Sequence, residues 1–308
     1  MPFAPGGPTD ATGRLVAEGL AARLGQRFLV ENVSGAGSSI GSARVARAAP
    51  DGHVLLVNHL ALLGSAALQA NLPYDTATAF APVGLINYGP MILIGGRDLP
   101  PRDVGSAFAW IRGRGDRVTL GHVGTGPALH LCGLLVQHRL GTRFTEIGYR
   151  GSAPAFQDML GGRVDVICDI STTGLPQVQA GNARAWAVTT RERLPVLPDV
   201  PTLAEAGLDG FDLVLWNALF APAGTPRPII ERLNTALREV LAEPATLARF
   251  ASFGTDTFPP AEQTPEAANT RLQAEIISIR DTLRAMGVEP ERYGGKGRTR
   301  ASAAPDQP

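Results

Sequence analysis

The sequence predicts an α/β protein of two lobes, each built on a mostly parallel sheet flanked by helices. Short apolar runs alternate with longer stretches of helical periodicity, a pattern typical of parallel strands joined by crossover helices. The alternation stops at Gly95-Gly96 and begins again near Val118, which indicates a second lobe. The length of 308 residues agrees, because hydrophobic cores usually stop growing near roughly 250 residues and then split.

The first lobe begins with a glycine loop at residues 4–10, followed by a helix that we expect Asp10 to cap and Gly25 to end. The next elements are expected to be a strand, a small-residue loop, a helix and a buried strand, at residues 28–30, 35–41, 42–49 and 54–57. A strand normally precedes such a glycine loop, but only three residues stand there. They form no signal peptide, so we interpret the chain as truncated or late-started.

The second lobe is expected at residues 97–217, after a strand at residues 91–94 that ends at the glycine pair. Its own strands are expected at residues 118–122, 144–149, 164–170 and 185–189. Its helices are expected at residues 128–140, after Ser152 and near Pro176. Residues 213–220 are extended and return the chain to the first lobe.

Residues 1–96 and 218–292 are therefore assigned to the first lobe. One of its later helices is expected to begin at Pro226 and a long last helix at Pro265. Apolar residues recur every three or four positions along the last helix, so it must dock on a lobe. Residues 293–308 are small and polar, and we expect a disordered tail there.

The composition argues against partners that depend on charge or on a membrane span. Lys296 is the only lysine among 28 basic residues and the formal net charge is zero, so no lysine-rich patch is available for nucleic acid. No apolar run approaches the roughly 20 residues that a membrane-spanning helix needs. We expect a folded globular protein with no nucleic-acid partner and no membrane span.

Cys132 and Cys168 are the two cysteines of the chain. Two cysteines neither form a disulfide framework nor show the paired spacing of a zinc site. Because free cysteines are among the most buried residues in proteins, we expect two separate buried thiols, with one bridge as the alternative.

Residues 37–41 match G-x-S-x-G, the nucleophile elbow of α/β-hydrolases, with Ser39 in the nucleophile position. In that fold the catalytic histidine follows late in the chain, whereas all five histidines here lie in the first half. The glycines around Gly35 also resemble a dinucleotide fingerprint, but Asn58 stands where the ribose-binding acid is expected. We therefore expect no enzyme and no cofactor, and keep the Ser39 hydrolase as the alternative.

Three histidines, His122, His130 and His138, recur every eight residues. That spacing drifts around a helix instead of lining one face, and acidic partners at ligand spacing are lacking. We expect no metal site. His130 lies in the first turn of a predicted helix, where a capping or packing role is favoured over ligand contact.

Small-residue loops recur between a strand and a helix, at residues 4–10, 33–41, 124–127 and 150–154. The N-terminus of a helix offers unpaired N–H groups and about half a positive charge. Such loops can hold a carboxylate without any arginine or lysine side chain. Anion binding between the lobes is the hypothesis that these loops support.

Seven segments in order along nearly the whole chain resemble tripartite tricarboxylate transporter solute-binding proteins, the Bug family. They are residues 2–10, 35–52, 72–75, 124–131, 149–155, 198–207 and 221–226. The resemblance implies a periplasmic-binding-protein-like fold of type II, with two lobes, crossing strands and a ligand cleft. It also implies a monomeric periplasmic protein that delivers a small carboxylate to a two-component membrane permease. A ligand-sensing clamp without transport remains the other alternative.

The resemblance also implies which residues bind the ligand. Loop residues that would anchor one carboxylate are Ala4, Gly6, Gly7, Thr9, Asp10, Gly124, Thr125, Arg150, Gly151, Ser152 and Ala153. Residues of the remaining pocket wall would be His59, Ser65, Asp169, Ile170 and Ser171, with Trp216 as a weaker candidate. Asp169 would favour a ligand with an amine or ring nitrogen if it faces the ligand, or else it holds a strand end by hydrogen bonds.

Overall fold

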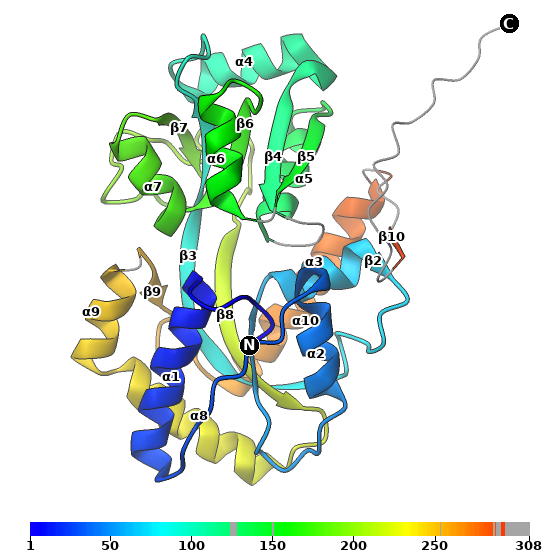
Figure 1. Ribbon diagram of the computed structural model, residues 1–308, viewed down its shortest axis with the longest axis vertical. Coiled ribbons are helices and arrows are strands. Elements are labelled where there is room, and N and C mark those ends of the chain that lie inside the picture. Colours follow the sequence, from blue (N-terminus) through cyan, green and yellow to red (C-terminus); the bar gives the residue numbers. More distant parts are fainter. Residues whose placement is uncertain (124–127, 150, 253, 286, 288–290, 293–308) are drawn as a thin grey trace, which may run out of the picture.

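Two long strands join the two lobes of the protein in the computed structural model (Figure 1). The structure describes residues 1–123, 128–149, 151–252, 254–285, 287 and 291–292. The joining strands are β3 (Phe80–Gly96) and β8 (Val214–Pro222). They pair antiparallel from Phe80 opposite Pro222 to Pro90 opposite Val214, so one ladder runs through the boundary between the lobes.

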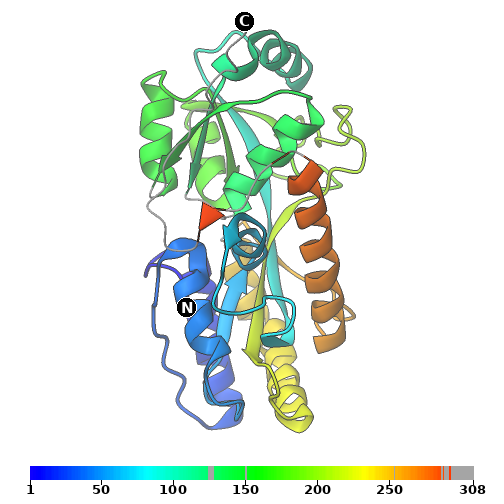
Figure 2. The same ribbon diagram turned by 90° about the vertical axis from the view of Figure 1, so that its right-hand side faces the viewer.

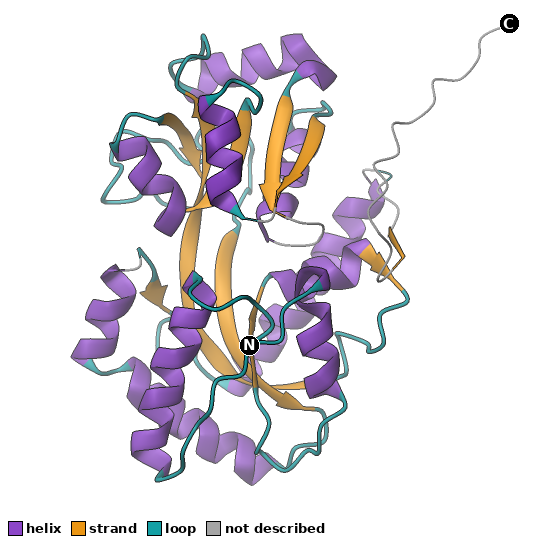
Figure 3. Ribbon diagram, viewed as in Figure 1, coloured by secondary structure: helices purple, strands orange, loops and turns teal. Residues whose placement is uncertain are grey.

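The first lobe contains both ends of the described chain and most of the helices. Its helices are α1 (Pro8–Leu24), η1 (Ala36–Ser38), α2 (Ser39–Ala46), α3 (Ala61–Leu68), α8 (Arg227–Leu241), α9 (Pro244–Ser252) and α10 (Pro265–Ala285). Its strands beside β3 and β8 are β1 (Leu56–His59) and β9 (Asp256–Thr257), and a separate parallel pair joins β2 (Gln69–Ala70) to β10 (Glu291–Arg292). Figure 3 shows the strands running through the middle with helices outside them.

The second lobe is inserted between the two crossing strands. Its strands are β4 (Thr119–Val123), β5 (Thr145–Tyr149), β6 (Val166–Ile170) and β7 (Ala183–Val188). Its helices are α4 (Val104–Arg114), η2 (Gly115–Arg117), α5 (Ala128–Arg139), α6 (Ser152–Leu160) and α7 (Ser171–Gln179). The order of strands through both lobes is β1-β8-β3-β6-β4-β5, with β7 and β9 paired to β3.

The α/β class and the two lobes agree with the prediction, whereas the expected parallel pairing holds only in part. In the second lobe β4 pairs in parallel with β5 and β6. In the main sheet of the first lobe, the described pairings of β1, β3, β8 and β9 are all antiparallel. The reason is that β8 returns beside β3 in the opposite direction, and β1 then pairs with the returning strand.

Strand β3 is far longer than the strand expected at residues 91–94, and it continues through Gly95 and Gly96. Both glycines pair with β7 inside the second lobe, so they do not end the strand. Packing requires a glycine at position 95, because a Cβ atom there would lie 2.0 Å from the ring of Trp186. Trp186 is buried in the main core cluster, which extends through both lobes.

Two further expectations about the first lobe are wrong. Residues 28–30 form no strand, and Leu29 is 77% exposed, because no neighbouring strand is present to pair with this apolar segment. Helix α1 begins at Pro8 with Gly7 as its N-cap, so Asp10 is not the cap. Proline suits the first turn because it lacks the N–H group that would remain unpaired there.

Cys132 and Cys168 form a disulfide that joins α5 to β6, with their Cα atoms 6.1 Å apart. The expectation of two separate thiols is therefore wrong, and the alternative of one bridge is right. A link between cysteines 36 positions apart stabilises a fold by about 2–4 kcal/mol, chiefly by restricting the unfolded chain.

Helix α10 lies along the crossing strands and reaches from the first lobe to the edge of the second (Figure 2). Its predicted start at Pro265 is confirmed, and its apolar face is buried through Ala268, Leu272, Ile279 and Leu283. Among the described residues, no helix is long and apolar enough to cross a bilayer.

Candidate functional site

Three helix N-termini open onto the boundary between the lobes: α1 from the first lobe, and α6 and α7 from the second (Figure 1). None of the three has a side-chain hydrogen bond at its N-cap, which is Gly7, Gly151 or Ile170. In contrast, α4 in the second lobe begins with a complete capping box on Asp103. Helix α8 also lacks a side-chain cap, so the distinctive feature is the convergence of three such ends.

Asp10 organises the first loop from inside α1. Its Oδ2 accepts hydrogen bonds from the Gly6 N–H and the Arg14 Nε, both at 2.9 Å, and its Oδ1 accepts one from Asn32 at 2.7 Å. Burial alone would raise the pKa of Asp10, but the bonds from Arg14, Asn32 and Gly6 outweigh it and lower the pKa to about 2. Asp10 is therefore an ionised structural group whose charge Arg14 balances.

The rest of the first loop offers backbone and small side chains. Ala4 and Gly6 are exposed and Gly7 is half-buried, whereas Thr9 is buried in the first turn of α1. Gly6 has a φ of +83°, a conformation that favours glycine. Its N–H group is already bonded to Asp10 in this structure, so the amides that remain for a ligand belong to its neighbours.

His59, one of the predicted wall residues, packs against the first loop. Its ring stacks on Phe3 with the centroids 4.2 Å apart and the planes 8° from parallel. Burial lowers the pKa of His59 to about 3, so the imidazole is neutral at physiological pH. Its Nδ1 accepts the Ala61 N–H at 3.0 Å, which leaves the proton on Nε2 as a donor.

Ser65 supports the second loop of the first lobe. Its hydroxyl donates to the Gly37 carbonyl at 2.7 Å, and Gln69 donates to the Ala36 carbonyl at 3.0 Å. Ser39 donates in turn to Gln69 at 2.9 Å and is fully buried. These bonds fix residues 36–39 against α3.

Asp169 is held inside the second lobe. Its Oδ1 accepts the Ser152 hydroxyl and the Ile170 N–H, both at 2.9 Å, and its Oδ2 accepts the Thr173 hydroxyl at 2.7 Å. Burial raises the pKa of Asp169 to about 6, although these bonds oppose the shift. The contacts favour the structural interpretation of Asp169, because they tie the starts of α6 and α7 to the end of β6.

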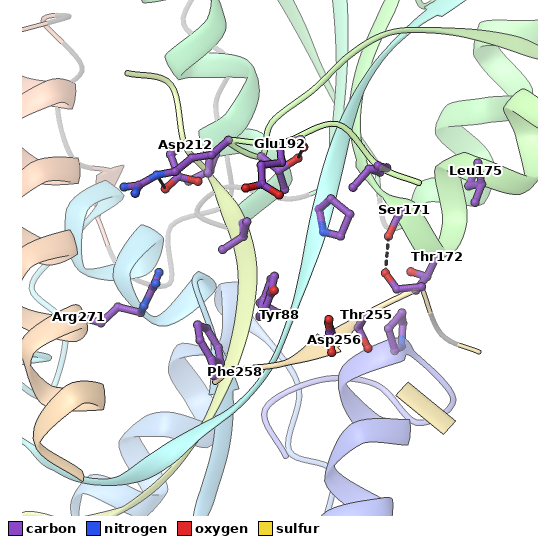
Figure 4. Close-up of a pocket in the computed structure, with 18 of the residues that line it drawn as sticks. Tyr88, Ser171, Thr172, Leu175, Glu192, Asp212, Thr255, Asp256, Phe258 and Arg271 are labelled. Atoms are coloured by element: carbon purple, nitrogen blue, oxygen red, sulfur yellow. Dashed lines mark hydrogen bonds and ion pairs between the residues drawn. The ribbon is translucent and has the colours of Figure 1, made fainter. Parts of the chain in front are cut away.

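Ser171 makes a direct contact between the lobes. Its hydroxyl donates to the Gly254 carbonyl of the first lobe at 3.0 Å (Figure 4). A groove between the lobes is lined on one side by Gly6, Gly7 and Pro8 and on the other by Ser171, Thr172 and Thr173. We call this region the interlobe groove.

The interlobe groove continues past the crossing strands to α10 and the segment before β8. There it is lined by Tyr88 and Phe258 and by charged side chains that include Glu192, Asp212 and Arg271 (Figure 4). Arg271 pairs with Glu275 at 2.9 Å, and Arg191 pairs with Asp212 at 2.7 Å.

Some of the remaining predicted site residues are described by the structure and others are not. Gly124, Thr125 and Arg150 lie outside the described residues. Gly151 precedes α6, Ala153 is exposed in its first turn, and Ile170 precedes α7. Trp216 is 1% exposed and its Nε1 donates to Glu275 at 2.7 Å, so it joins β8 to α10.

Sequence reasoning missed the residues that hold the loops in shape. Asn32 bridges Asp10 and the Phe3 carbonyl, at 2.7 and 3.0 Å, and Gln69, which directly follows α3, bonds to the Ala36 carbonyl of η1. Each acts across 22 to 33 positions of sequence, so no local motif signals it. The role of Phe3 could not be predicted from local sequence either, because its stacking partner His59 lies far along the chain.

The Ser39 nucleophile elbow, kept as the alternative, does not have the surroundings that a hydrolase requires. An elbow follows a strand directly, whereas residues 26–35 form no strand. The Ser39 hydroxyl bonds to Gln69, an amide that cannot act as a general base.

Comparisons with known proteins show which family the chain belongs to. The family model described as tripartite tricarboxylate transporter family receptor matches residues 12–278. A UPF0065 protein from the TAR-I ttuE-ttuC' intergenic region of Agrobacterium vitis is 43% identical over 93% of this chain and 83% of its own length.

Two solved structures of similar size also match the fold. The periplasmic binding protein BugD is 37% identical, with a TM-score of 0.83 over 94% of this chain and 97% of its own. MatC from Rhodopseudomonas palustris with bound malate is 36% identical, with a TM-score of 0.82 over 92% of this chain and 96% of its own. The chain therefore belongs to the tripartite tricarboxylate transporter receptor family, whose characterised members are solute-binding proteins.

Proposed function

We propose that this protein captures a small organic acid between its lobes outside the cytoplasm and delivers it to a two-component membrane permease of the tripartite tricarboxylate type. Dicarboxylates of the size of malate are the first candidates, since the similar MatC binds malate. The protein acts by binding alone, and no residue is assigned a catalytic role.

The observation that carries this proposal is the convergence of the N-termini of α1, α6 and α7 at the boundary between the lobes. Each N-terminus carries about half a positive charge, and its attraction for an anion is typically about 0.3–1 kcal/mol when exposed and up to about 2 kcal/mol when partly buried. Closure of the lobes excludes water and strengthens the same N–H contacts.

The contacts of Asp169 favour a plain organic acid over an amino acid. Hydrogen bonds from Ser152, Thr173 and the Ile170 amide satisfy both oxygens of this carboxylate. Asp169 therefore needs no ammonium group from the ligand. In this proposal it keeps Ser152 and the start of α7 in position.

In this proposal the lobes are residues 1–96 with 218–292, and residues 97–217. They close by bending of β3 and β8, the two strands that cross between them. The ligand contacts come from the first loop, through Ala4, Gly7 and Thr9, and from Gly151, Ser152, Ala153, Ile170 and Ser171. His59 and Ser65 shape the wall behind the first loop.

We place the protein in the periplasm, where its relatives of the binding-protein class work. The buried bridge between Cys132 and Cys168 suits this compartment, because disulfides persist in oxidising surroundings and are rare in the cytosol.

A thermal-shift screen tests the proposal, because a ligand that binds only the folded state raises the melting temperature by mass action. The panel contains malate, succinate, adipate, citrate, aspartate and benzoate. We expect a saturable rise with at least one dicarboxylate and a smaller rise with aspartate. If none of these acids raised the melting temperature, the proposed function would be wrong.

Gly7→Val tests the first loop separately. The φ of Gly7 is −80°, and a Cβ atom there would meet nothing closer than the Ala4 carbonyl oxygen at 3.9 Å, so the fold should accept valine. The added methyl groups should hinder a carboxylate from approaching the backbone. Gly113→Val in α4, where a Cβ atom meets nothing within 4 Å, is the matched control. A full ligand response in Gly7→Val would remove the first loop from the site.

A further inference from the structure

Two buried histidines and a glutamate meet in the second lobe: His122 on β4, His130 in the first turn of α5 and Glu146 on β5. The spacing of eight residues was a poor guide, because His122 lies on a strand and α5 crosses over the sheet beside it. His122 pairs in register with Gly148, two positions beyond Glu146, so Glu146 shares the face of the sheet on which His122 lies.

The three side chains offer donor atoms at close range. The His130 Nε2 lies 2.9 Å from the Glu146 Oε2, and the His122 and His130 rings stack with centroids 4.0 Å apart. One nitrogen from each ring and one carboxylate oxygen all lie within 4.8 Å of one another. The two histidines are only 8% and 6% exposed, whereas the Glu146 side chain is 32% exposed, so solvent reaches the cluster on the glutamate side.

A neighbouring glutamine orients the carboxylate of the cluster. The side-chain amide of Gln137 donates to the Glu146 Oε1 at 3.1 Å, and the Gln137 Oε1 accepts the Phe144 N–H at 2.9 Å, so one carboxylate oxygen has a fixed partner. Such outer hydrogen bonds are typical of metal-binding carboxylates. The His130 Nδ1 is buried and has no hydrogen-bond partner among the described residues, which is unusual for a buried polar atom.

We propose that His122, His130 and Glu146 bind a divalent transition-metal ion of the zinc class. Two imidazoles and one carboxylate suit zinc, cobalt, nickel or copper, whereas magnesium and calcium prefer oxygen ligands. Zinc bonds of about 2.0–2.2 Å place tetrahedral donors roughly 3.3 Å apart, so the stacked rings must turn slightly when the ion enters. The site leaves at least one position for water or another ligand.

The bound ion would tie β4, β5 and α5 together at the end of the sheet. His122 precedes Gly124 and Thr125 by two and three positions, so the ion would lie close in sequence to a loop predicted to contact the ligand. The metal site is nevertheless independent of the proposed function, because it consists of other residues.

Zinc titration of the purified, tag-free and chelator-treated protein, without any carboxylate present, tests the proposal by calorimetry. We expect one zinc ion per chain with micromolar or tighter affinity, a higher melting temperature, and no response to magnesium. His122→Ala and Glu146→Gln should each weaken binding at least roughly tenfold. His138→Ala, which removes an exposed histidine of the same helix, should bind zinc like the parent protein.

Cobalt provides a second measurement that does not depend on the stability of a variant. Cobalt in a low-coordinate site with two imidazoles gives intense visible absorption, and zinc should displace it. No zinc binding by the folded parent protein would overturn the proposal, and so would equal affinity in folded His122→Ala and the parent. The weak spectrum of six-coordinate, hydrated cobalt would also overturn it.

Discussion

The Gly6 N–H donates to the Asp10 carboxylate at 2.9 Å, so a side chain in the first turn of α1 closes the loop that precedes the helix. The same carboxylate holds Arg14 and Asn32. The first loop is therefore held in shape without a ligand, and in the proposed function an anion would meet N–H groups that are already oriented. Such preorganisation reduces the conformational entropy that binding must otherwise remove.

Asp10→Asn should destabilise the protein and weaken its response to ligand. The amide cannot accept from Gly6, Arg14 and Asn32 together, and a buried group left without a partner costs about 1–3 kcal/mol. Because the folded-state pKa of about 2 lies below the ordinary value of 3.8, the stability from the ionised group is present above about pH 4 and is lost as the pH falls towards 2. Urea unfolding of both proteins at pH 7 and pH 3 measures this.

The control for Asp10 is Asp209→Asn, which changes an exposed carboxylate. Its stability should follow that of the parent protein at both pH values. An equal difference between Asp10→Asn and the parent at pH 7 and pH 3 would contradict the assignment of a depressed pKa to the first loop.

Asp169 should give the opposite pH dependence. Its folded-state pKa of about 6 lies above 3.8, so the folded state holds a proton that the unfolded state has released between about pH 4 and pH 6. Stability from this group is therefore highest below about pH 4 and falls as the pH rises through 6. Against Asp169→Asn, the parent protein should gain on the order of 1–3 kcal/mol when the pH is lowered from 7 to 4.

Unfolding curves of the parent and Asp169→Asn at pH 7, 5.5 and 4 check this prediction. Lowering the pH is expected to protonate the carboxylate, whose new proton the Ser152 or Thr173 hydroxyl can accept after rotating. A constant difference between the two proteins across this range would show that Asp169 does not change protonation there.

The sequence was most informative where a structural feature depends on neighbouring residues. Pro265 marks the start of α10 and Gly25 the end of α1, because both residues meet local requirements of the backbone at a helix end. The length of β3 could not be predicted, because Gly84, Gly89 and Pro90 interrupt its apolar pattern. Only the pairing with β8 shows that the strand continues.

Features that join distant residues could not be predicted in this way. The bridge between Cys132 and Cys168 and the cluster of His122 with Glu146 depend on how α5 packs across β4, β5 and β6. For the candidate site, the loops were predicted from their glycines and helix starts. Their supports Asn32 and Gln69 act through side chains across the fold, which leaves no local pattern.

Gly95→Ala and Gly96→Ala should differ although the residues are neighbours. A Cβ atom at Gly95 would lie 2.0 Å from the Trp186 ring, whereas one at Gly96 would meet Leu99 and Met159 at ordinary distances of 3.6 and 3.7 Å. Overpacking of a core typically costs about 1–3 kcal/mol, and Trp186 is fully buried with little room to move. Denaturant unfolding should therefore show a clear loss for Gly95→Ala and a small change for Gly96→Ala.

A smaller residue at position 186 extends this test. Trp186→Leu combined with Gly95→Ala should lose less stability than the two separate losses added together, because the leucine leaves room for the new methyl group. Additive losses would mean that Trp186 is not the obstacle.

Trp216 should stabilise the junction between α10 and the crossing strand β8 through one hydrogen bond. Its Nε1 donates to the Glu275 Oε2 at 2.7 Å, and Arg271 holds the other carboxylate oxygen at 2.9 Å. Burial raises the pKa of Glu275, while the bonds from Trp216 and Arg271 oppose the rise. Trp216→Phe keeps an aromatic ring but removes the donor, so we expect a loss of about 1–3 kcal/mol and a further rise in that pKa.

Trp110→Phe is the matched control, because Trp110 lies half-buried on α4, away from the crossing strands. At neutral pH, urea unfolding should give a lower free energy of unfolding for Trp216→Phe than for Trp110→Phe. In mild acid, the free energy of unfolding of Trp216→Phe should come closer to that of the parent protein. Because its pKa is raised, Glu275 becomes protonated in the folded state at a higher pH than in the unfolded state. A protonated, neutral carboxyl group loses less stability than a carboxylate when the Trp216 donor is absent. If Trp216→Phe and Trp110→Phe unfolded at the same urea concentration, the hydrogen bond to Glu275 would contribute nothing to the junction.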